Sequence, residues 1–222
     1  MLMRRLLNAM VRLLARILLR VQVTGLEHVP KDGALMIMIN HINFIDGPLV
    51  LGLIPRDSIA MTKAETFRMP LLAPLAWLYG VFPVRRGEVD REALRRAEET
   101  LAAGKGLLFA PEGHRSGSGE LQAAKDGLVY LASRTGTPIL PVAVTGVEDF
   151  RRNIVRLRRT DVQVTIGAPF RLPRMPDGMP RQVRKEMTAQ AMYQLARLMP
   201  ERYQGVYRDI PARDNLLIAS DV

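Results

Sequence analysis

The 222-residue chain contains no cysteine, and this absence excludes several kinds of chemistry. A disulfide framework, a thiolate zinc site and a cysteine nucleophile all need the missing side chain. A chain without cysteine is also compatible with a reducing cytoplasm. Aromatic residues are scarce as well, at 5% of the sequence. Proteins that bind single-stranded nucleic acid stack bases on aromatic rings, so this composition disfavours that class.

The amino-terminal segment has no acidic residue before Glu27, although it is rich in arginine. The whole chain has 32 Lys and Arg against 22 Asp and Glu, a net charge of +10. Half of this surplus precedes Glu27, on Arg4, Arg5, Arg12, Arg16 and Arg20. Such a surplus predicts a polyanionic partner, which can be nucleic acid, an anionic membrane or a phosphorylated small molecule.

These arginines and Asn8 recur at about every fourth position, which predicts one amphipathic helix over residues 2–21. Its charges are too frequent for a membrane span, which needs about 20 predominantly apolar residues. It also lacks the unbroken apolar region and the cleavage site of a signal peptide. We therefore expect a peripheral helix that lies in the headgroup plane at the cytoplasmic face of the cell membrane. The alternative is a terminal helix that covers the core and leaves its arginines in water.

Short apolar segments alternate with amphipathic ones through the rest of the chain. This alternation predicts a single α/β domain whose mostly parallel or mixed sheet is covered by helices. Strands are expected at residues 34–40, 58–61, 81–84, 106–110, 138–145 and 162–166, and helices at residues 67–79, 90–103, 122–134 and 181–199. The expected division is a helix over residues 1–21, a main domain over 22–200 and a carboxyl-terminal tail over 201–222.

His41 directly follows the apolar segment 34–40, and Asp46 comes five residues later. Open α/β sheets place ligands at the carboxyl ends of their strands, so both residues are expected at a functional edge. A carboxylate beside one imidazole nitrogen fixes the tautomer and leaves the other nitrogen to accept a proton. We therefore predict that His41 is a general base oriented by Asp46, a role worth roughly 10²- to 10⁴-fold in rate. The alternative is a loop histidine beside an ordinary helix-capping aspartate.

A second group of polar residues follows the expected strand at residues 106–110. Glu112 can orient a polar group or a hydroxyl, and Gly113 allows a close backbone approach. Arg115 can clasp a phosphate with two N–H groups. The alternative for these residues is a polar turn without a function.

Two cationic positions also come directly after expected strands. Lys63 follows residues 58–61 and is suited to steady a phosphate or a developing oxyanion. Arg85 and Arg86 follow residues 81–84, and adjacent arginines at a strand end can form an anion site, although paired arginines are also common on surfaces. Each group is a weak signal alone. Their recurrence at four strand ends predicts a site.

These motifs together resemble those of the glycerolipid acyltransferase family, whose bacterial members include the 1-acylglycerol-3-phosphate acyltransferases. Residues 41–46 match the H-x4-D motif of that family, and residues 111–116 resemble its P-E-G-T-R-S motif. Residues 80–85 resemble its second motif and residues 139–142 its fourth. The resemblance extends over residues 22–150 and implies an acyltransferase domain.

The resemblance implies an enzyme that moves a fatty acyl chain from acyl-CoA or acyl carrier protein to the sn-2 hydroxyl of 1-acylglycerol-3-phosphate, forming phosphatidic acid. His41, oriented by Asp46, would deprotonate that hydroxyl as it attacks the thioester. A thioester is already activated, and the sequence offers no cysteine nucleophile or G-x-S-x-G elbow, so neither an acyl-enzyme nor a cofactor is expected. The expected residues for binding the acceptor are Lys63, Arg85, Glu112, Gly113 and Arg115.

Two departures from the family motifs bear on the acceptor: Asn43 stands where serine is commoner, and His114 replaces the usual threonine. The same chemistry on lysophosphatidylethanolamine or an amino-acid lipid therefore stays an alternative. A non-catalytic basic domain that binds membrane or nucleic acid is the alternative from another class, although no nucleic-acid-binding motif is visible. The three histidines (His28, His41 and His114) are scattered along the chain, so no metal site is expected.

Overall fold

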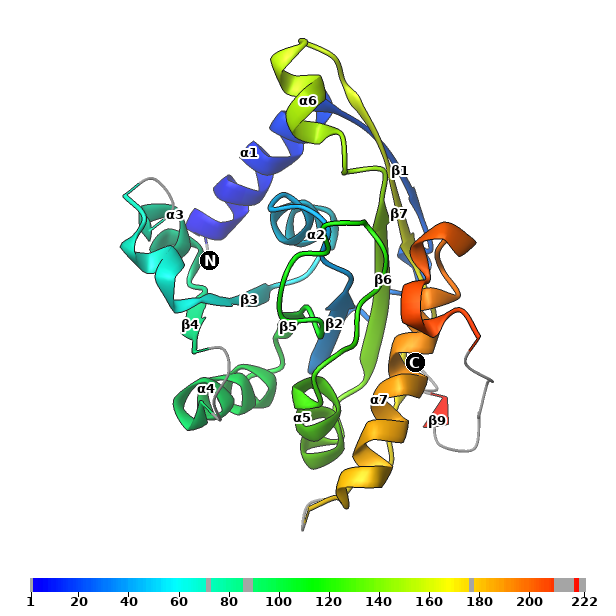
Figure 1. Ribbon diagram of the computed structural model, residues 1–222. Helices are drawn as coiled ribbons and strands as arrows, with labels where there is room; N and C mark the ends of the chain where they lie inside the picture. The colour runs from blue at the N-terminus through cyan, green and yellow to red at the C-terminus, as the bar shows by residue number, and fades with distance from the viewer. Residues whose placement is uncertain (1, 71–72, 86–89, 176–177, 210–217, 220–222) are drawn as a thin grey trace.

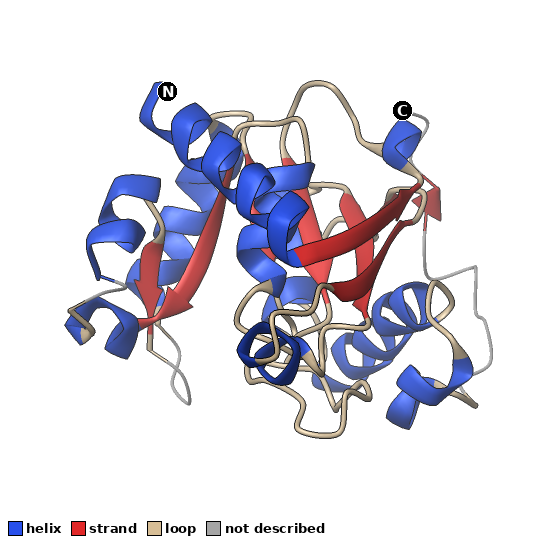
Figure 2. Ribbon diagram, turned by 90° about the horizontal axis from the view of Figure 1, so that it is seen from above, coloured by secondary structure: helices blue, strands red, loops and turns tan. Residues whose placement is uncertain are grey.

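The computed structural model shows one mixed sheet of nine strands in the described residues, with helices on both faces (Figure 1, Figure 2). The structure describes the chain except residues 1, 71–72, 86–89, 176–177, 210–217 and 220–222. The strands are β1 (Leu19–Thr24), β2 (Leu35–Ile39), β3 (Ser58–Lys63), β4 (Phe82–Val84), β5 (Gly106–Phe109), β6 (Ile139–Thr145), β7 (Thr160–Ile166), β8 (Phe170–Arg171) and β9 (Ile218–Ala219). Their order is β1-β7-β6-β2-β5-β3-β4, with β8 on β6 and β9 on β8. This confirms the predicted α/β class.

The helices divide between the two faces of the sheet. They are α1 (Leu2–Leu18), α2 (Asp46–Leu53), α3 (Ala73–Tyr79), α4 (Arg91–Ala102), α5 (Gly127–Thr135), α6 (Phe150–Val155) and α7 (Arg181–Ala196), with 3-10 turns η1 (Leu26–His28), η2 (Ala64–Arg68), η3 (Glu201–Tyr203) and η4 (Gly205–Tyr207). Side chains of α4, α5 and α7 form one core with the sheet, and those of α1, α2 and α6 form the other. The expected helix over residues 67–79 is instead η2 followed by α3.

Strand β2 is apolar without interruption because it is buried on both faces. Met36 and Met38 point into the core under α4, α5 and α7, whereas Leu35, Ile37 and Ile39 point into the opposite core. All five side chains are at most 1% exposed. A central strand with parallel neighbours, covered by helices on both sides, is expected to read as a continuous apolar run. This strand ends one residue before Asn40 and therefore sets the position of His41.

The sheet begins earlier than the sequence pattern predicts. The expected helix over residues 2–21 is too long, because α1 ends at Leu18 and β1 begins at Leu19. Leu19, Val21 and Val23 alternate with more exposed residues, and the strand pairs in parallel with β7. This long-range pairing decides the structure of a segment in which the arginine spacing alone favours helix. The amino-terminal helix is thus joined directly to an edge strand of the sheet.

Polar side chains of α1 take part in its contact with the protein body. The contacts are an ion pair from Arg4 to Asp57 and hydrogen bonds from Tyr79 to Asn8 and from Arg12 to the carbonyl of Gly52. The helix exposes a stripe of large apolar residues instead: Met3, Leu6, Met10, Leu13, Leu14 and Ile17. Leu6, Leu13 and Ile17 are each more than half exposed. In the described part of the chain, no helix is both long and apolar enough to cross a membrane.

Helix α5 begins at Gly127, so the expected helix over residues 122–134 starts too early. Backbone N–H groups of the preceding segment donate to distant acceptors: Leu121 to the Tyr203 carbonyl, Ala124 to the Tyr207 hydroxyl and Lys125 to the Pro111 carbonyl. Because these N–H groups bond to distant acceptors, they do not form the hydrogen bonds of a helix. Residues 121–125, here named the strap, therefore run without regular secondary structure between β5 and α5.

The residues after α7 belong to the core. Tyr203 and Tyr207, in η3 and η4, are 5% and 6% exposed and pack with side chains of α5 and α7. Gly205 lies between them with a φ of 52°, and a Cβ on it would sit 2.1 Å from the carbonyl oxygen of Leu121. Residues 201–208 are therefore a structural part of the domain, although the sequence placed them in a tail.

Candidate active site

Four parallel strands bring the predicted site residues to one edge of the sheet. Strands β2 and β5 are neighbours, with Met38 opposite Phe109. Strand β3 pairs with β5, and β4 pairs with β3, all in the same direction. Their carboxyl ends therefore lie along one edge in the order β2, β5, β3, β4. The predicted site residues extend from or follow these ends: His41 after β2, Glu112 after β5, Lys63 at the end of β3 and Arg85 after β4.

The imidazole of His41 lies against the carboxylate of Asp46, with Nδ1 3.1 Å from Oδ2. The same oxygen accepts the N–H groups of Ile42 and Asn43, at 2.7 Å each. A carboxylate only accepts hydrogen bonds, so in the neutral imidazole Nδ1 carries the proton and Nε2 keeps its lone pair. The Asp46 side chain is 0% exposed, whereas that of His41 is 21% exposed. This geometry fits a general base whose ring is oriented by a carboxylate at Nδ1.

Asp46 does not act as an ordinary helix cap. Helix α2 begins at Asp46 itself, and its N-cap residue, Ile45, makes no side-chain capping bond. The carboxylate closes the turn over residues 41–46 instead, through the two N–H groups and the imidazole. The turn therefore holds the histidine and its partner as one unit.

Two buried asparagines hold this turn against β6, a role that the sequence patterns did not reveal. Asn40 exchanges two hydrogen bonds with the backbone of Val144, each at 2.8 Å. Asn43 donates from Nδ2 to the carbonyl of Val147 at 2.9 Å. The Asn40 bonds continue the contact of β2 with β6 past the end of β2, and the Asn43 bond reaches the segment that follows β6. The sequence feature that could have indicated this role is the presence of two asparagines, Asn40 and Asn43, around His41 at the end of an apolar strand.

Glu112 binds the backbone around His41. Its side chain is 1% exposed, and its two oxygens accept from the N–H groups of His41 and Gln122, at 2.9 Å each. The N–H of Ser116 in turn donates to the carbonyl of His41 at 2.7 Å. Burial raises the pKa of the Glu112 carboxyl, and the two N–H bonds oppose that shift. Glu112 was expected to shape the acceptor pocket, and the structure shows it positioning the backbone of His41.

The remaining predicted residues lie at or after the ends of β5, β3 and β4, along the same edge of the sheet. Arg115 is exposed, and Gly113 has a φ of 74°, a left-handed conformation that favours glycine. A Cβ on Gly113 would lie 3.3 Å from Cε of Lys125, a cation that the sequence motifs did not mark. Lys63 is half-buried at the end of β3.

Arg85 is exposed at the end of β4, and its backbone is tied to the start of α4. Its N–H donates to Asp90 at 2.9 Å, and the same carboxylate caps the helix by accepting from Ala93 at 3.0 Å. These N–H groups lower the pKa of the Asp90 carboxyl. Arg86, the other member of the predicted pair, lies outside the described residues.

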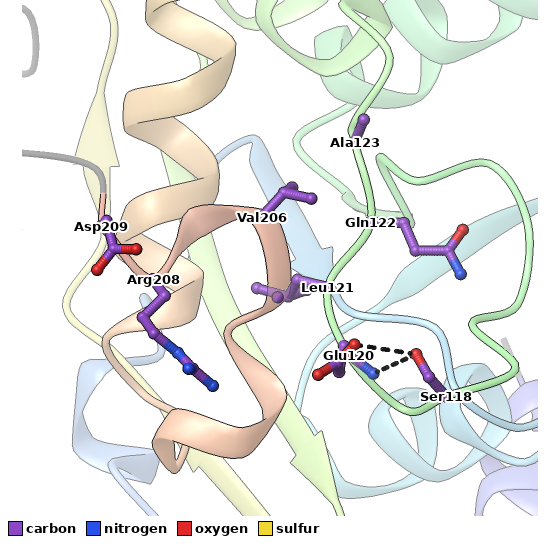
Figure 3. Close-up of a pocket in the computed structure, with 9 residues that line it drawn as sticks. Ser118, Glu120, Leu121, Gln122, Ala123, Val206, Arg208 and Asp209 are labelled. Carbon is purple, nitrogen blue, oxygen red and sulfur yellow. Dashed lines mark hydrogen bonds between the residues drawn. The ribbon is translucent and has the colours of Figure 1, made fainter.

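An open pocket lies between the strap and the carboxyl-terminal segment (Figure 3). It is lined by residues from 118–123 and 205–209 and does not include His41. It is connected with the turn over residues 41–46 through Gln122, whose N–H donates to Glu112, which in turn accepts from the N–H of His41. The pocket is therefore a neighbour of the active centre and not the centre itself. Among the residues that the structure describes, no three His, Asp or Glu side chains are grouped to hold a metal ion.

The profile of the acyltransferase family matches residues 20–145, which is more than half of the chain. The chain belongs to the acyltransferase family. The matched part of this acyltransferase runs from β1 through β6 and contains every predicted site residue. It ends before α6, α7 and residues 201–208, which bond to the strap.

Two relatives of this acyltransferase are named for the same activity. The chain is 29% identical over 134 residues to a 1-acyl-sn-glycerol-3-phosphate acyltransferase of Borreliella burgdorferi, covering 60% of this chain and 54% of that protein. It is 30% identical over 158 residues to a chloroplastic enzyme of the same name from Brassica napus, covering 68% and 45%. The chain thus spans about half the length of these curated relatives.

A solved structure shows the same fold. The crystal structure of PlsC from Thermotoga maritima, described as a 1-acyl-sn-glycerophosphate acyltransferase, matches with a TM-score of 0.63 and 27% sequence identity. The match covers 85% of this chain and 76% of the other. The arrangement of sheet and helices is therefore that of an acyltransferase domain.

Proposed function

We propose that this acyltransferase transfers a fatty acyl group from acyl-CoA or acyl carrier protein to the free sn-2 hydroxyl of 1-acylglycerol-3-phosphate. The product would be phosphatidic acid. The observation that carries the proposal is the contact of 3.1 Å between Nδ1 of His41 and the buried carboxylate of Asp46. The activity named for the relatives from Borreliella burgdorferi and Brassica napus supports the choice of acceptor.

In the proposed reaction, Nε2 of His41 takes the proton of the acceptor hydroxyl while its oxygen attacks the thioester carbonyl. The carbon–sulfur bond of the resulting tetrahedral intermediate then breaks, and the imidazolium returns its proton to the leaving thiolate. Asp46 stabilises the imidazolium through Nδ1–H and keeps the ring in place between the two steps. No cofactor is needed besides the donor, because the thioester is already an activated acyl group.

The acceptor's phosphate is proposed to bind the cations along the same edge of the sheet. Arg115 follows β5, Arg85 follows β4, and Lys63 ends β3. Guanidinium groups bind phosphate oxygens through paired, charge-assisted hydrogen bonds. Lys125, beside Gly113, adds a further positive charge near that loop.

Thiol release measures the proposed reaction directly. The purified protein is mixed with acyl-CoA or acyl carrier protein and a panel of lysophospholipids, and free thiol and product mass are followed. We expect turnover with 1-acylglycerol-3-phosphate and weaker turnover with lysophosphatidylethanolamine, which carries a different headgroup. Turnover only with another acceptor would keep the chemistry and change the substrate. Salt-sensitive binding of anions without any thiol release would identify a non-catalytic binding domain instead.

The membrane association of α1 is also part of the proposal. The helix uses polar side chains such as Arg4 and Asn8 to bond to the protein body, while its apolar stripe is exposed. Trp77 on α3, a helix that contacts α1, is 71% exposed. An exposed apolar stripe flanked by arginines suits the headgroup region of an anionic leaflet. We propose that α1 binds the cytoplasmic surface of the membrane, where the lipid acceptor resides.

Surface substitutions test α1 better than truncation does, because removal of the helix uncovers α2. Leu6→Ser, Leu13→Ser and Ile17→Ser together should weaken flotation with anionic vesicles without loss of folding. Each arginine near an anionic surface contributes about 1 kcal/mol, so the parent should bind less at high salt. Val206→Ser, at an exposed position of η4, is the matched control. Equal flotation of the triple variant and the parent would assign α1 to a purely structural role.

A further inference from the structure

Residues 151–159, here named the basic tip, form a second exposed surface that combines apolar and cationic side chains. The segment contains five arginines and no acid: Arg151, Arg152, Arg156, Arg158 and Arg159. Between them stand Ile154, Val155 and Leu157, which are 39%, 82% and 96% exposed. Scattered exposed apolar residues are ordinary on a surface, but three within four positions form a patch. The basic tip lies beyond the part of the chain that matches the acyltransferase family.

Leu157 occupies a backbone conformation that leucine rarely adopts. Its φ is 53°, and it is the one non-glycine residue with positive φ in the described part of the chain. The left-handed region costs a residue with a Cβ about 1–2 kcal/mol relative to the right-handed one. Glycine or asparagine would relieve this strain, and neither would expose a large apolar side chain. Leu157 keeps this strained conformation although its side chain contacts water and not the rest of the protein. This combination suggests that the side chain binds another molecule.

The basic tip is attached to the catalytic turn on one side. Phe150, just before it, packs edge-on against Phe44, with ring centroids 5.8 Å apart. The guanidinium of Arg151 lies over the same Phe44 ring at 5.7 Å. Phe44 is itself part of the turn between His41 and Asp46 and is 49% exposed. The basic tip therefore stands beside the active centre.

On its other side the basic tip adjoins the end of α1. Arg159 donates from Nε to the carbonyl of Leu19 at 3.0 Å, and Leu19 directly follows α1. Thr160, the next residue, pairs with Leu19 across β7 and β1. Figure 1 shows α6 at the carboxyl-terminal end of α1. The basic tip thus lies next to the carboxyl-terminal end of α1, where Ile17 is exposed.

We propose that the basic tip is a second membrane-inserting site, which binds anionic lipid headgroups with its arginines and places Val155 and Leu157 at the acyl-chain boundary. The inference deepens the proposed membrane association of α1 and rests on it. An anionic bilayer fits because the apolar side chains protrude rather than line a groove, and because arginines flank them on both sides. Contact at both α1 and the basic tip would hold the catalytic turn, through Phe44, at a fixed position relative to the lipid surface.

A single fluorescent label tests insertion directly, because the chain has no cysteine of its own. Leu157→Cys is labelled with an environment-sensitive dye and mixed with vesicles of phosphatidylcholine containing one third phosphatidylglycerol. We expect a blue shift and a rise in intensity, which vesicles of phosphatidylcholine alone should produce only weakly. Val206→Cys, at an exposed site on η4, is the matched control and should show neither change. An unchanged spectrum at position 157 while the labelled protein floats with the vesicles would overturn the proposal.

Substitutions separate the apolar from the charged contribution. Val155→Ser with Leu157→Gly should weaken flotation roughly tenfold, and the glycine should leave the fold intact because it suits the positive φ. Arg156→Gln with Arg158→Gln should weaken flotation by about fivefold per arginine at low salt and by less at high salt. Arg181→Gln with Lys185→Gln, at exposed positions of α7, removes the same charge elsewhere and should have a small effect. Equal losses in this control would show that only net charge matters and would overturn the proposal.

Two outcomes distinguish this inference from others. If the variants of the basic tip float like the parent but lose turnover with acyl carrier protein and not with acyl-CoA, the surface binds an acidic protein. That result would overturn the membrane assignment. If the parent releases no thiol from any donor, the proposed reaction fails, yet the fluorescence and flotation of the same variants still decide whether the basic tip inserts.

Discussion

The turn that carries His41 and the cations at the neighbouring strand ends differ in burial. Asp46 and Glu112 are at most 1% exposed, and the backbone of His41 is hydrogen-bonded at both its N–H and its carbonyl. Arg85 and Arg115 have exposed side chains. A base that is already in place needs no reorganisation before the reaction, whereas an exposed guanidinium must give up water and side-chain freedom when it binds a phosphate. Substitutions in the turn should therefore lower kcat, and substitutions of the cations should raise KM.

The largest effect should follow the loss of the base. His41→Ala should reduce kcat by roughly 10²- to 10⁴-fold with little change in the acceptor's KM. Asp46→Asn should reduce it by at least about tenfold, because the amide no longer stabilises the imidazolium. Thiol release gives the rates, and thermal unfolding checks that both variants fold. Near-normal thiol release by His41→Ala would refute the proposed mechanism.

Glu112→Gln tests whether the backbone of His41 needs hydrogen bonds at both its N–H and its carbonyl. A glutamine has one accepting oxygen, so one of the N–H groups of His41 and Gln122 loses its partner. We expect kcat to fall by about tenfold or more while both KM values stay within about twofold, as for a positioning residue. A rise in the acceptor's KM alone would return Glu112 to the acceptor pocket.

The raised pKa of Glu112 gives this variant a pH signature. The carboxyl binds its proton more tightly in the folded protein than in the unfolded chain. Its contribution to the free energy of unfolding is thus fully present below its unfolded pKa and is lost as the pH rises through the higher folded pKa. Glutamine does not titrate, so the stability deficit of Glu112→Gln relative to the parent should shrink over that interval. Chemical denaturation at graded pH measures this difference, and a deficit that grows with pH would contradict the prediction.

Arginine substitutions test the other half of the comparison. Arg115→Ala should raise the acceptor's KM by an amount equivalent to about 1.5–3 kcal/mol, and Arg85→Ala should raise it less. The KM of the acyl donor should stay close to that of the parent. Arg115→Lys keeps the charge but loses the paired N–H groups, so it should recover only part of the affinity. Equal changes for donor and acceptor would assign these arginines a structural role.

The last effect is on stability and concerns the strap rather than the chemistry. Tyr207→Phe leaves the N–H of Ala124 without its acceptor, which should cost about 1–3 kcal/mol of the free energy of unfolding. Tyr193→Phe removes a hydroxyl on the adjacent helix α7 and is the control, with an expected change below about 0.5 kcal/mol. Denaturant unfolding of both variants supplies the comparison. Equal stability of the two would show that the strap does not depend on this bond.

Much of the site could be predicted because its signals are local. A buried strand needs a short apolar run, and residues just past its end must reach the carboxyl edge of the sheet. The positions of His41, Lys63 and Arg85 follow from that rule, and so does the pairing of His41 with Asp46 across one turn. The contact of Glu112 with the backbone of His41 could not be predicted, because the two residues are distant in the chain and every residue except proline has the same N–H group.

The amino-acid sequence by itself determined the α/β class, the residues at the strand ends and the excess of positive charge, because periodicity, motif spacing and composition need no knowledge of distant contacts. Only the tertiary structure decided that residues 19–24 form a strand, that α5 starts after the strap and that residues 201–208 join the core. It also decided which side of α1 is exposed and brought the basic tip beside Phe44. In each case a backbone group or a helix face finds its partner far along the chain, and local propensity carries no information about that choice.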